Sequence, residues 1–282
     1  MARLTEKENR VRKRIFDQVL SQGTCPLVEE IASELSLSRS EMAEIFKALE
    51  ASGCVAMSNP GHAGMKVFQQ EELEEPTPPV GEIFYARPFS VFKNHYPIWV
   101  DGEQRWYAEC AVEACAVWDM FPGREVVLRS VCRQTGEAVE LIAREGRLVE
   151  YSPKTLRVHI GIPFRYFLDD LVGWCDYNSF FVSEEAVEEW SKAHPDVEGI
   201  TRDPSEISTF FVNTIARGRV DYYEQISFPV LKVLSNLRKY GLTKPVTRLG
   251  FPVLDTFWIP TLHTLMELRR KGFKNYVRIS LF

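Results

Sequence analysis

The chain has 282 residues, of which 45% are hydrophobic and 26% charged, and 34 Lys and Arg against 39 Asp and Glu leave a net charge of −5. This composition is typical of folded globular proteins and excludes a wholly disordered chain. No apolar run reaches the ~18–20 residues that a membrane-spanning helix needs, and no export signal follows the basic N-terminus. We therefore expect a cytoplasmic protein of about two domains, without a membrane partner.

The N-terminal part of the chain has the pattern of three short helices. Apolar residues recur at helical spacing in the segments 6–20, 26–35 and 38–50. The third segment has the clearest start, because Ser38 and Glu41 have the spacing of a capping box. Two short apolar runs, 54–57 and 66–68, then flank a turn-rich stretch, as in a β-hairpin. Three helices followed by a hairpin predict a winged-helix-like domain over residues 1–70.

A linker and a strand-rich region follow. Residues 71–80 are acidic and proline-rich, a composition that favours an extended linker. Beyond them, aromatic and β-branched runs predict strands at 82–86, 95–100, 125–132, 137–142, 147–151 and 155–160. The Ala-rich segment 110–120 predicts a buried helix, and Ser183 is the expected cap of another. We therefore predict an α+β protein in which a mixed β-sheet, flanked by helices, forms a catalytic domain over residues 81–215.

The last part of the chain, residues 216–282, is apolar and aromatic. Helical patterns occur near 224–240 and 258–271, and a short strand is predicted at 276–282. We expect a helical C-terminal extension that packs on the core or against a second copy of the chain in a homodimer, and both alternatives stay open.

Six cysteines at irregular spacing predict free thiols and not a disulfide framework. Cys110 and Glu113 stand three residues apart on a predicted helix, so the carboxylate can reach the thiol. A thiol beside a base is a candidate nucleophile or metal ligand, whereas a plain core position is the alternative for any single cysteine. Because no CxxC pair is present, a structural zinc site is not predicted.

Three segments carry a resemblance to a known family: WYAECAVEACAVWDMFPGREVVLRSVCRQTGEAVEL, GWCDYNSFFVS and EEWSKAHPDVEGI. Over about residues 25–215 the chain resembles the organomercurial (alkylmercury) lyases. In that family a helix carries a Cys and, three residues on, an Asp, followed by a hairpin and by a second Cys just before a Phe-Phe pair. Cys110 and Cys175 match the two cysteines, and Glu113 stands at the position of the aspartate.

The resemblance implies an enzyme that cleaves the carbon–mercury bond of alkyl or aryl mercury by protonolysis, giving hydrocarbon and Hg(II). Cys110 and Cys175 would bind mercury, a soft cation suited to thiolates, and Glu113 would relay the proton and then hold Hg(II). No resident cofactor is implied. Low-molecular-weight thiols would remove the product, and a mercuric reductase is a candidate downstream partner. Glu113 departs from the family by one C–C bond, about 1.5 Å.

Two other functions fit parts of the pattern. In a metal-sensing winged-helix regulator, the thiols would bind a metal and the segment 38–50 would read DNA. That segment carries Arg39 and Lys47 against Glu41, Glu44 and Glu50, and its net charge of −1 argues against a nucleic-acid partner. A non-lyase homologue would act on, or only bind, another organometal or soft metal.

Overall fold

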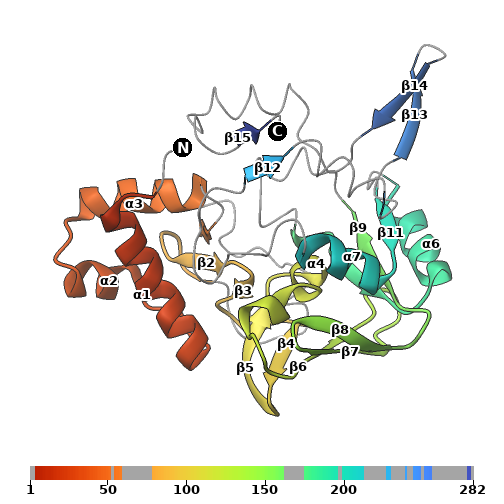
Figure 1. Cartoon of the computed structure of the whole chain (residues 1–282), viewed down its shortest axis with the longest axis horizontal. Helices are drawn as coiled ribbons and strands as arrows, with labels where there is room; N and C mark the ends of the chain where they lie inside the picture. Colours follow the sequence, from red (N-terminus) through yellow and green to blue (C-terminus); the bar gives the residue numbers. More distant parts are fainter. Residues whose placement is uncertain are drawn as a thin grey trace.

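The computed structural model describes residues 4–51, 54–58, 78–161, 175–195 and 199–212, and the short segments 227–229, 239, 244–248, 251–255 and 278–280 (Figure 1). Within these ranges, three helices lie at one end of the molecule and an antiparallel sheet forms its centre. The predicted α+β class is therefore confirmed. No helix in the described ranges combines the length and the apolar character needed to cross a membrane.

The three N-terminal helices are confirmed as α1 (Glu6–Gln22), α2 (Val28–Glu34) and α3 (Arg39–Ala51). The predicted capping box is present, because the Ser38 hydroxyl accepts the Glu41 backbone N–H while the Glu41 carboxylate accepts the Ser38 backbone N–H. The helices bury their apolar faces against one another through Val11, Ile15, Val19, Ile31, Met42, Ile45 and Leu49.

The strand that follows these helices joins the central sheet. β1 (Val55–Met57) pairs antiparallel with β2 (Ile83–Ala86). Its expected hairpin partner, residues 66–68, lies outside the described residues, as does most of the expected linker, 71–80. The winged-helix-like domain therefore stays a prediction. The helices and the central sheet share one hydrophobic core.

The central sheet has eight strands in the order β1-β2-β3-β5-β4-β6-β7-β8. The strands not yet named are β3 (Phe89–Ser90), β4 (Pro97–Val100), β5 (Glu103–Ala108), β6 (Val126–Val131), β7 (Ala138–Arg144) and β8 (Arg147–Ser152). The hairpin predicted from 125–132 and 137–142 is confirmed as β6–β7. The prediction of a mixed sheet was wrong, since every pairing in this sheet is antiparallel. Short turns join several successive strands, and a parallel pairing would need a crossover of a dozen residues or more.

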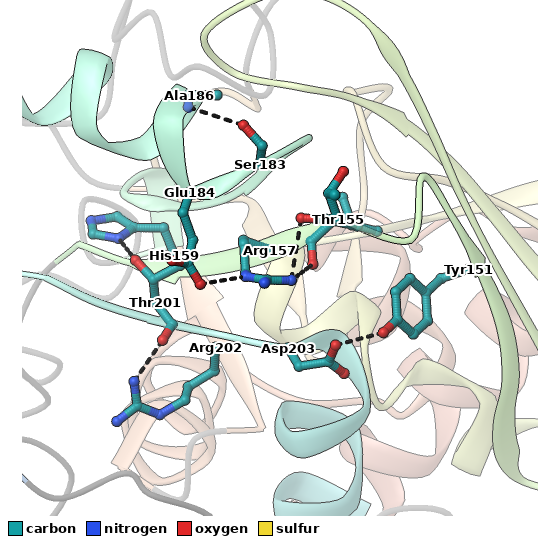
Figure 2. Close-up of polar contacts among 11 residues, drawn as sticks. Tyr151, Thr155, Arg157, His159, Ser183, Glu184, Ala186, Thr201, Arg202 and Asp203 are labelled. Atoms are coloured by element: carbon teal, nitrogen blue, oxygen red, sulfur yellow. Dashed lines mark hydrogen bonds and ion pairs between the residues drawn. The ribbon is translucent and has the colours of Figure 1, made fainter.

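A second sheet has three strands in the order β10-β9-β11: β10 (Asn178–Phe181), β9 (Arg157–Ile160) and β11 (Ile200–Arg202). Figure 2 shows polar contacts within this sheet and with α6 (Glu184–Ala193), and the contact of Tyr151 of β8 with Asp203, the cap of α7 (Pro204–Phe211). Arg157 Nε donates to Glu184 over 3.0 Å, and His159 Nδ1 lies 2.9 Å from Thr201 Oγ1. Ser183 caps α6 as predicted, because its hydroxyl accepts the Ala186 backbone N–H.

The helix predicted over residues 110–120 is broken. α4 (Ala111–Ala114) is a single turn, and the 3₁₀ helix η2 (Val117–Met120) follows after Ala116, whose φ of −135° is not helical. Cys110 is the N-cap residue of α4 and lies outside the helix proper. Every residue of the segment except Asp119 is buried, so tertiary packing and not the helix propensity of alanine decides its conformation.

The helical C-terminal extension is not confirmed. In the described part of residues 216–282, β12 (Ser227–Pro229) pairs parallel with β15 (Arg278–Ser280), and β13 (Lys244–Arg248) forms a hairpin with β14 (Phe251–Asp255). The helix predicted at 224–240 is contradicted at β12, where a proline ends the segment. The strand predicted at 276–282 is confirmed by β15, and the predicted helix 258–271 lies outside the described residues.

The C-terminal end of α1 is held against β5. Trp106 Nε1 donates to the Val19 carbonyl oxygen over 2.8 Å, and Arg105 Nη1 donates to the Ser21 carbonyl oxygen, also over 2.8 Å. Gly23 ends α1 in the left-handed conformation, with φ 73°. A Cβ at this position would overlap the backbone carbonyl oxygen of Arg105. Only a glycine therefore allows the helix to end this close to the strand.

We predict that Gly23→Ala destabilises the protein more than Gly136→Ala. Both glycines have a φ near 72°, so both variants lose ~1–2 kcal/mol to the left-handed backbone. A Cβ at Gly136 meets nothing within 4 Å, whereas the Cβ at Gly23 adds an overlap worth ~1–3 kcal/mol. Denaturant unfolding of both variants measures the difference, and equal losses would show that α1 does not need its close contact with β5.

We also predict that Tyr151→Phe lowers stability by about 1 kcal/mol near pH 7, and by less at acid pH. Tyr151 donates to Asp203 Oδ2 over 2.5 Å, and Asp203 also caps α7 (Figure 2). Burial alone would raise the pKa of Asp203, but hydrogen bonds from Ser205 and Tyr151 outweigh burial and lower it. The hydrogen bond to Asp203 raises the pKa of Tyr151 to about 12.

The sign of the pH dependence follows from these two shifts. The contribution of Asp203 is present above about pH 4 and is lost as the pH falls through its lowered folded-state pKa. The contribution of Tyr151 is present below about pH 10 and is lost as the pH rises through about 12. Urea unfolding of the wild type and Tyr151→Phe at pH 3 and pH 7 tests this, and a difference that does not shrink at pH 3 would contradict it.

Candidate functional site

Cys110 lies between the end of strand β5 of the central sheet and the start of α4. β5 ends at Ala108, and Cys110 follows with an extended backbone (φ −164°, ψ 174°) as the N-cap residue of α4. Its side chain is fully buried, and α4 packs against β5, β9 and β10. Glu113 lies three residues on, in the single turn of α4, and is buried as well. The sequence spacing therefore places a thiol and a carboxylate at the same buried junction.

Cys175 reaches this junction from a distant segment. Residues 175 and 176 are helical, just before β10, and the Cys175 side chain is fully buried. The Cys110 thiol is a close enough neighbour to raise the pKa of Cys175. Asn178 of β10 adds a long contact, from Nδ2 to Cys110 Sγ at 3.9 Å. The structure thus brings together the two cysteines that sequence analysis selected.

The buried surroundings keep the second thiol protonated. Burial raises the pKa of Cys175 well above its ordinary value, the neighbouring Cys110 raises it further, and the positive charge of Arg87 opposes the rise. Burial also raises the pKa of Cys115, and the neighbouring Cys110 adds to this rise. A metal ion that binds such a thiol must displace its proton, so binding releases acid that a nearby base can take.

A group of three buried charges adjoins the thiols. Arg87 donates from Nε to Glu109 Oε1 and from Nη2 to Glu113 Oε1, each over 2.6 Å. All three side chains are at least nine-tenths buried. A guanidinium at this distance favours the ionised form of a carboxylate, and buried charges are tolerated only when they are paired in this way. Glu113 is therefore bound to Arg87 in the structure.

Sequence analysis missed Arg87 and Glu109. Glu109 directly precedes Cys110, so a second acid beside the candidate thiol was a signal in the sequence. Arg87 had no such signal, because it comes from the turn between β2 and β3, and only the folded sheet brings it to α4.

Buried aromatic side chains lie near the thiols. The hydroxyl of Tyr96 donates to the Asn178 carbonyl oxygen over 3.2 Å, and its ring packs on Phe180 at 5.9 Å. The hydroxyl of Tyr85 is buried and has no hydrogen-bond partner in the part of the chain that the structure describes. Burial raises the pKa of Tyr85 strongly, and the neighbouring Cys175 and Glu109 add to the rise. Electrostatic interactions are strong in such an environment.

The other four cysteines are free thiols, as expected. Cys54, Cys115 and Cys132 are buried, and Cys25 is partly buried. Cys132 belongs to a separate apolar cluster with Phe181 and Trp190. Among the described residues, no group of three or more His, Cys, Asp or Glu side chains is arranged to hold a metal ion. Cys110, Glu113 and Cys175 are therefore not arranged as a three-ligand metal group in the described structure, in which Glu113 is bound to Arg87.

Comparison with known proteins agrees with this reading. The family model of the alkylmercury lyases (MerB) matches residues 89–215, a range that contains both cysteines. An alkylmercury lyase of Bacillus cereus is 34% identical over 100 residues, which are 34% of this chain and 43% of that protein. One of Staphylococcus epidermidis is 35% identical over 104 residues, 34% of this chain and 44% of that protein. The chain thus spans less than half the length of these relatives.

The fold has a counterpart among solved structures. A crystal structure of the mercury-bound form of MerB2 matches with a TM-score of 0.54 at 19% identity, over 76% of this chain and 92% of that one. At this identity the likeness concerns the fold alone. The sequence likeness is confined to part of the chain: residues 89–215 match the alkylmercury lyase family model, and the two relatives share 34–35% identity over 100–104 residues.

Proposed function

We propose that this protein cleaves the carbon–mercury bond of organomercurials by protonolysis, with Cys110 and Cys175 as mercury ligands and Glu113 as the proton relay. The observation that supports the proposal most is the approach of two fully buried thiols from distant segments of the chain. Hg(II) is a soft cation that prefers a pair of thiolates, so this pair suits it better than a harder metal ion. The match of residues 89–215 to the alkylmercury lyase family model supports the same chemistry.

The reaction balances with the groups that the site provides. One cysteine displaces the small ligand that accompanies the organomercury cation, and the cysteine proton leaves with that ligand. The second cysteine binds mercury through sulfur and passes its proton to the Glu113 carboxylate. Glu113 then protonates the carbon while the carbon–mercury bond breaks, and the electron pair of that bond becomes the new C–H bond. Hydrocarbon leaves, and Hg(II) stays on two thiolates.

The surroundings of Glu113 suit an acid–base relay. Arg87 favours its carboxylate form, which is the form that can accept a proton from a thiol. Once protonated, a carboxyl group beside a guanidinium is a stronger acid and gives its proton up readily. Two small thiols from solution then exchange with the cysteines, carry Hg(II) away and return a proton to each sulfur.

The main alternative is a protein that binds or senses a metal, and in a sensor the N-terminal helices would have to contact DNA. On α3, Glu41 is paired with Lys7 of α1 over 2.6 Å, so one of the basic side chains of this end is already neutralised. The pKa of Glu41 falls to about 2 because of the hydrogen bonds from Lys7 and Ser38. An acidic group that stays ionised on the expected recognition helix argues against contact with DNA phosphates.

We predict that the purified protein, given methylmercury and excess thiol, releases methane and Hg(II), and that Cys110→Ser and Cys175→Ser abolish the release. Each serine removes one of the two soft ligands, so electron donation to mercury is lost. Cys132→Ser is the matched control, because Cys132 is also a buried thiol but lies in the separate cluster with Trp190. Gas chromatography of the headspace measures methane.

Two results would decide against the proposal. If the wild type releases no more methane than the serine variants and yet binds one Hg(II) tightly, the site binds metal without cleaving the bond. If Cys132→Ser abolishes release as completely as Cys110→Ser, at unchanged folding by circular dichroism, the paired thiols have no special role.

A further inference from the structure

Arg87 is fixed to the site by its backbone as well as by its side chain. Its N–H donates to the Cys54 carbonyl oxygen over 3.1 Å. The next residue, Pro88, accepts the Glu109 backbone N–H over 3.0 Å. The turn between β2 and β3 is therefore attached on one side to the segment before β1, and on the other to the residue before Cys110.

The guanidinium of Arg87 bridges two carboxylates with two different nitrogens. Nε contacts Glu109 and Nη2 contacts Glu113, each at 2.6 Å. Because the guanidinium is planar, its donors have a fixed separation and direction, so fixing one end orients the other. The contact with Glu109 thus determines where Nη2 points, and Nη2 determines where the Glu113 carboxylate lies.

Stability alone is a weak reason for this arrangement. Each ion loses several kcal/mol of hydration when it is buried, and apolar residues of similar volume often stabilise an interior equally well or better. Arg87, Glu109 and Glu113 all carry this cost within one small volume beside two thiols. Fixing the position of a reacting group is a better explanation.

We propose that Arg87 is the positioning residue of this site: it holds the Glu113 carboxylate in place beside Cys110 and Cys175, and Glu109 holds Arg87 in turn. The inference rests on the proposed function. It also explains why a glutamate serves where the resembling family has an aspartate. The extra C–C bond of about 1.5 Å adds one rotatable torsion, and the hydrogen bond from Arg87 removes that freedom.

The proposal makes an unusual prediction for Glu113→Asp, which matches the family. The shorter side chain ends about 1.5 Å short of the position at which Arg87 Nη2 holds the wild-type carboxylate, so kcat falls on the order of 10²-fold. Arg87→Met and Arg87→Lys give a similar fall in kcat with KM changed only a few-fold, because substrate is still bound by the two thiols. A lysine has one nitrogen and cannot reproduce the two-nitrogen bridge.

Two substitutions at Glu109 separate positioning from folding. Glu109→Gln keeps an oxygen that accepts from Arg87 Nε and retains most of the wild-type kcat, whereas Glu109→Leu loses kcat as Arg87→Met does. Arg129→Met is the control, because Arg129 pairs with Glu140 over 2.8 Å and stacks on Trp99, on exposed parts of the sheet. Steady-state methane release gives kcat and KM, and circular dichroism verifies folding.

Crystal structures of the wild type and Arg87→Met, each loaded with Hg(II), provide a readout that does not depend on turnover. We expect the Glu113 carboxylate to move by more than about 1 Å in the variant. An unmoved carboxylate, or a kcat for Arg87→Met equal to that of Arg129→Met, overturns the positioning role. A wild type that cleaves no substrate overturns the proposed function, and the two crystal structures then still decide whether Arg87 places Glu113.

Discussion

The buried group formed by Arg87, Glu109 and Glu113 is the constraint around which the centre of this protein is arranged. None of the three charges could stay in the interior alone, because an unpaired buried ion loses its hydration without compensation. The two carboxylates therefore share the guanidinium of Arg87, and the three side chains come from the β2–β3 turn, the end of β5 and the first turn of α4. A fold that satisfies all three must bring these segments to one place, and this is the place where Cys110 lies.

The thiols depend on the same arrangement. Cys175 comes from a segment that follows β6, β7, β8 and β9 in the chain, and it lies close to Cys110 just before β10. Burial raises its pKa, while the positive charge of Arg87 works in the opposite direction. The arginine thus acts on both halves of the candidate site, since it binds the carboxylate directly and influences the thiol through space. Aromatic residues such as Tyr85 and Tyr96 surround the thiols and strengthen that influence by excluding water.

Local signals in the sequence were sufficient to predict much of the fold but few of the residues of the candidate site. The capping residues Ser38 and Ser183 and the turn between β6 and β7 predicted their elements correctly, because caps and tight turns depend on neighbouring residues. The pairing of β1 with β2 and the break after α4 depend on contacts between distant residues, which no local pattern contains. The pairing of Cys110 with Cys175 could be expected only from a family resemblance, and Arg87 could not be expected at all.

The attachment of α1 to β5 determines how much of the chain has to be kept when the site is studied in isolation. The family match begins at residue 89, which invites a shortened protein that starts there. In such a fragment Trp106 and the adjoining face of β5 would lose the helix end that covers them, although Trp106 is 3% exposed in the intact protein. Two residues beyond β5 stands Cys110, so a loosened strand would misplace the first thiol. The smallest useful fragment therefore begins at Thr5, the cap of α1, and not where the family likeness begins.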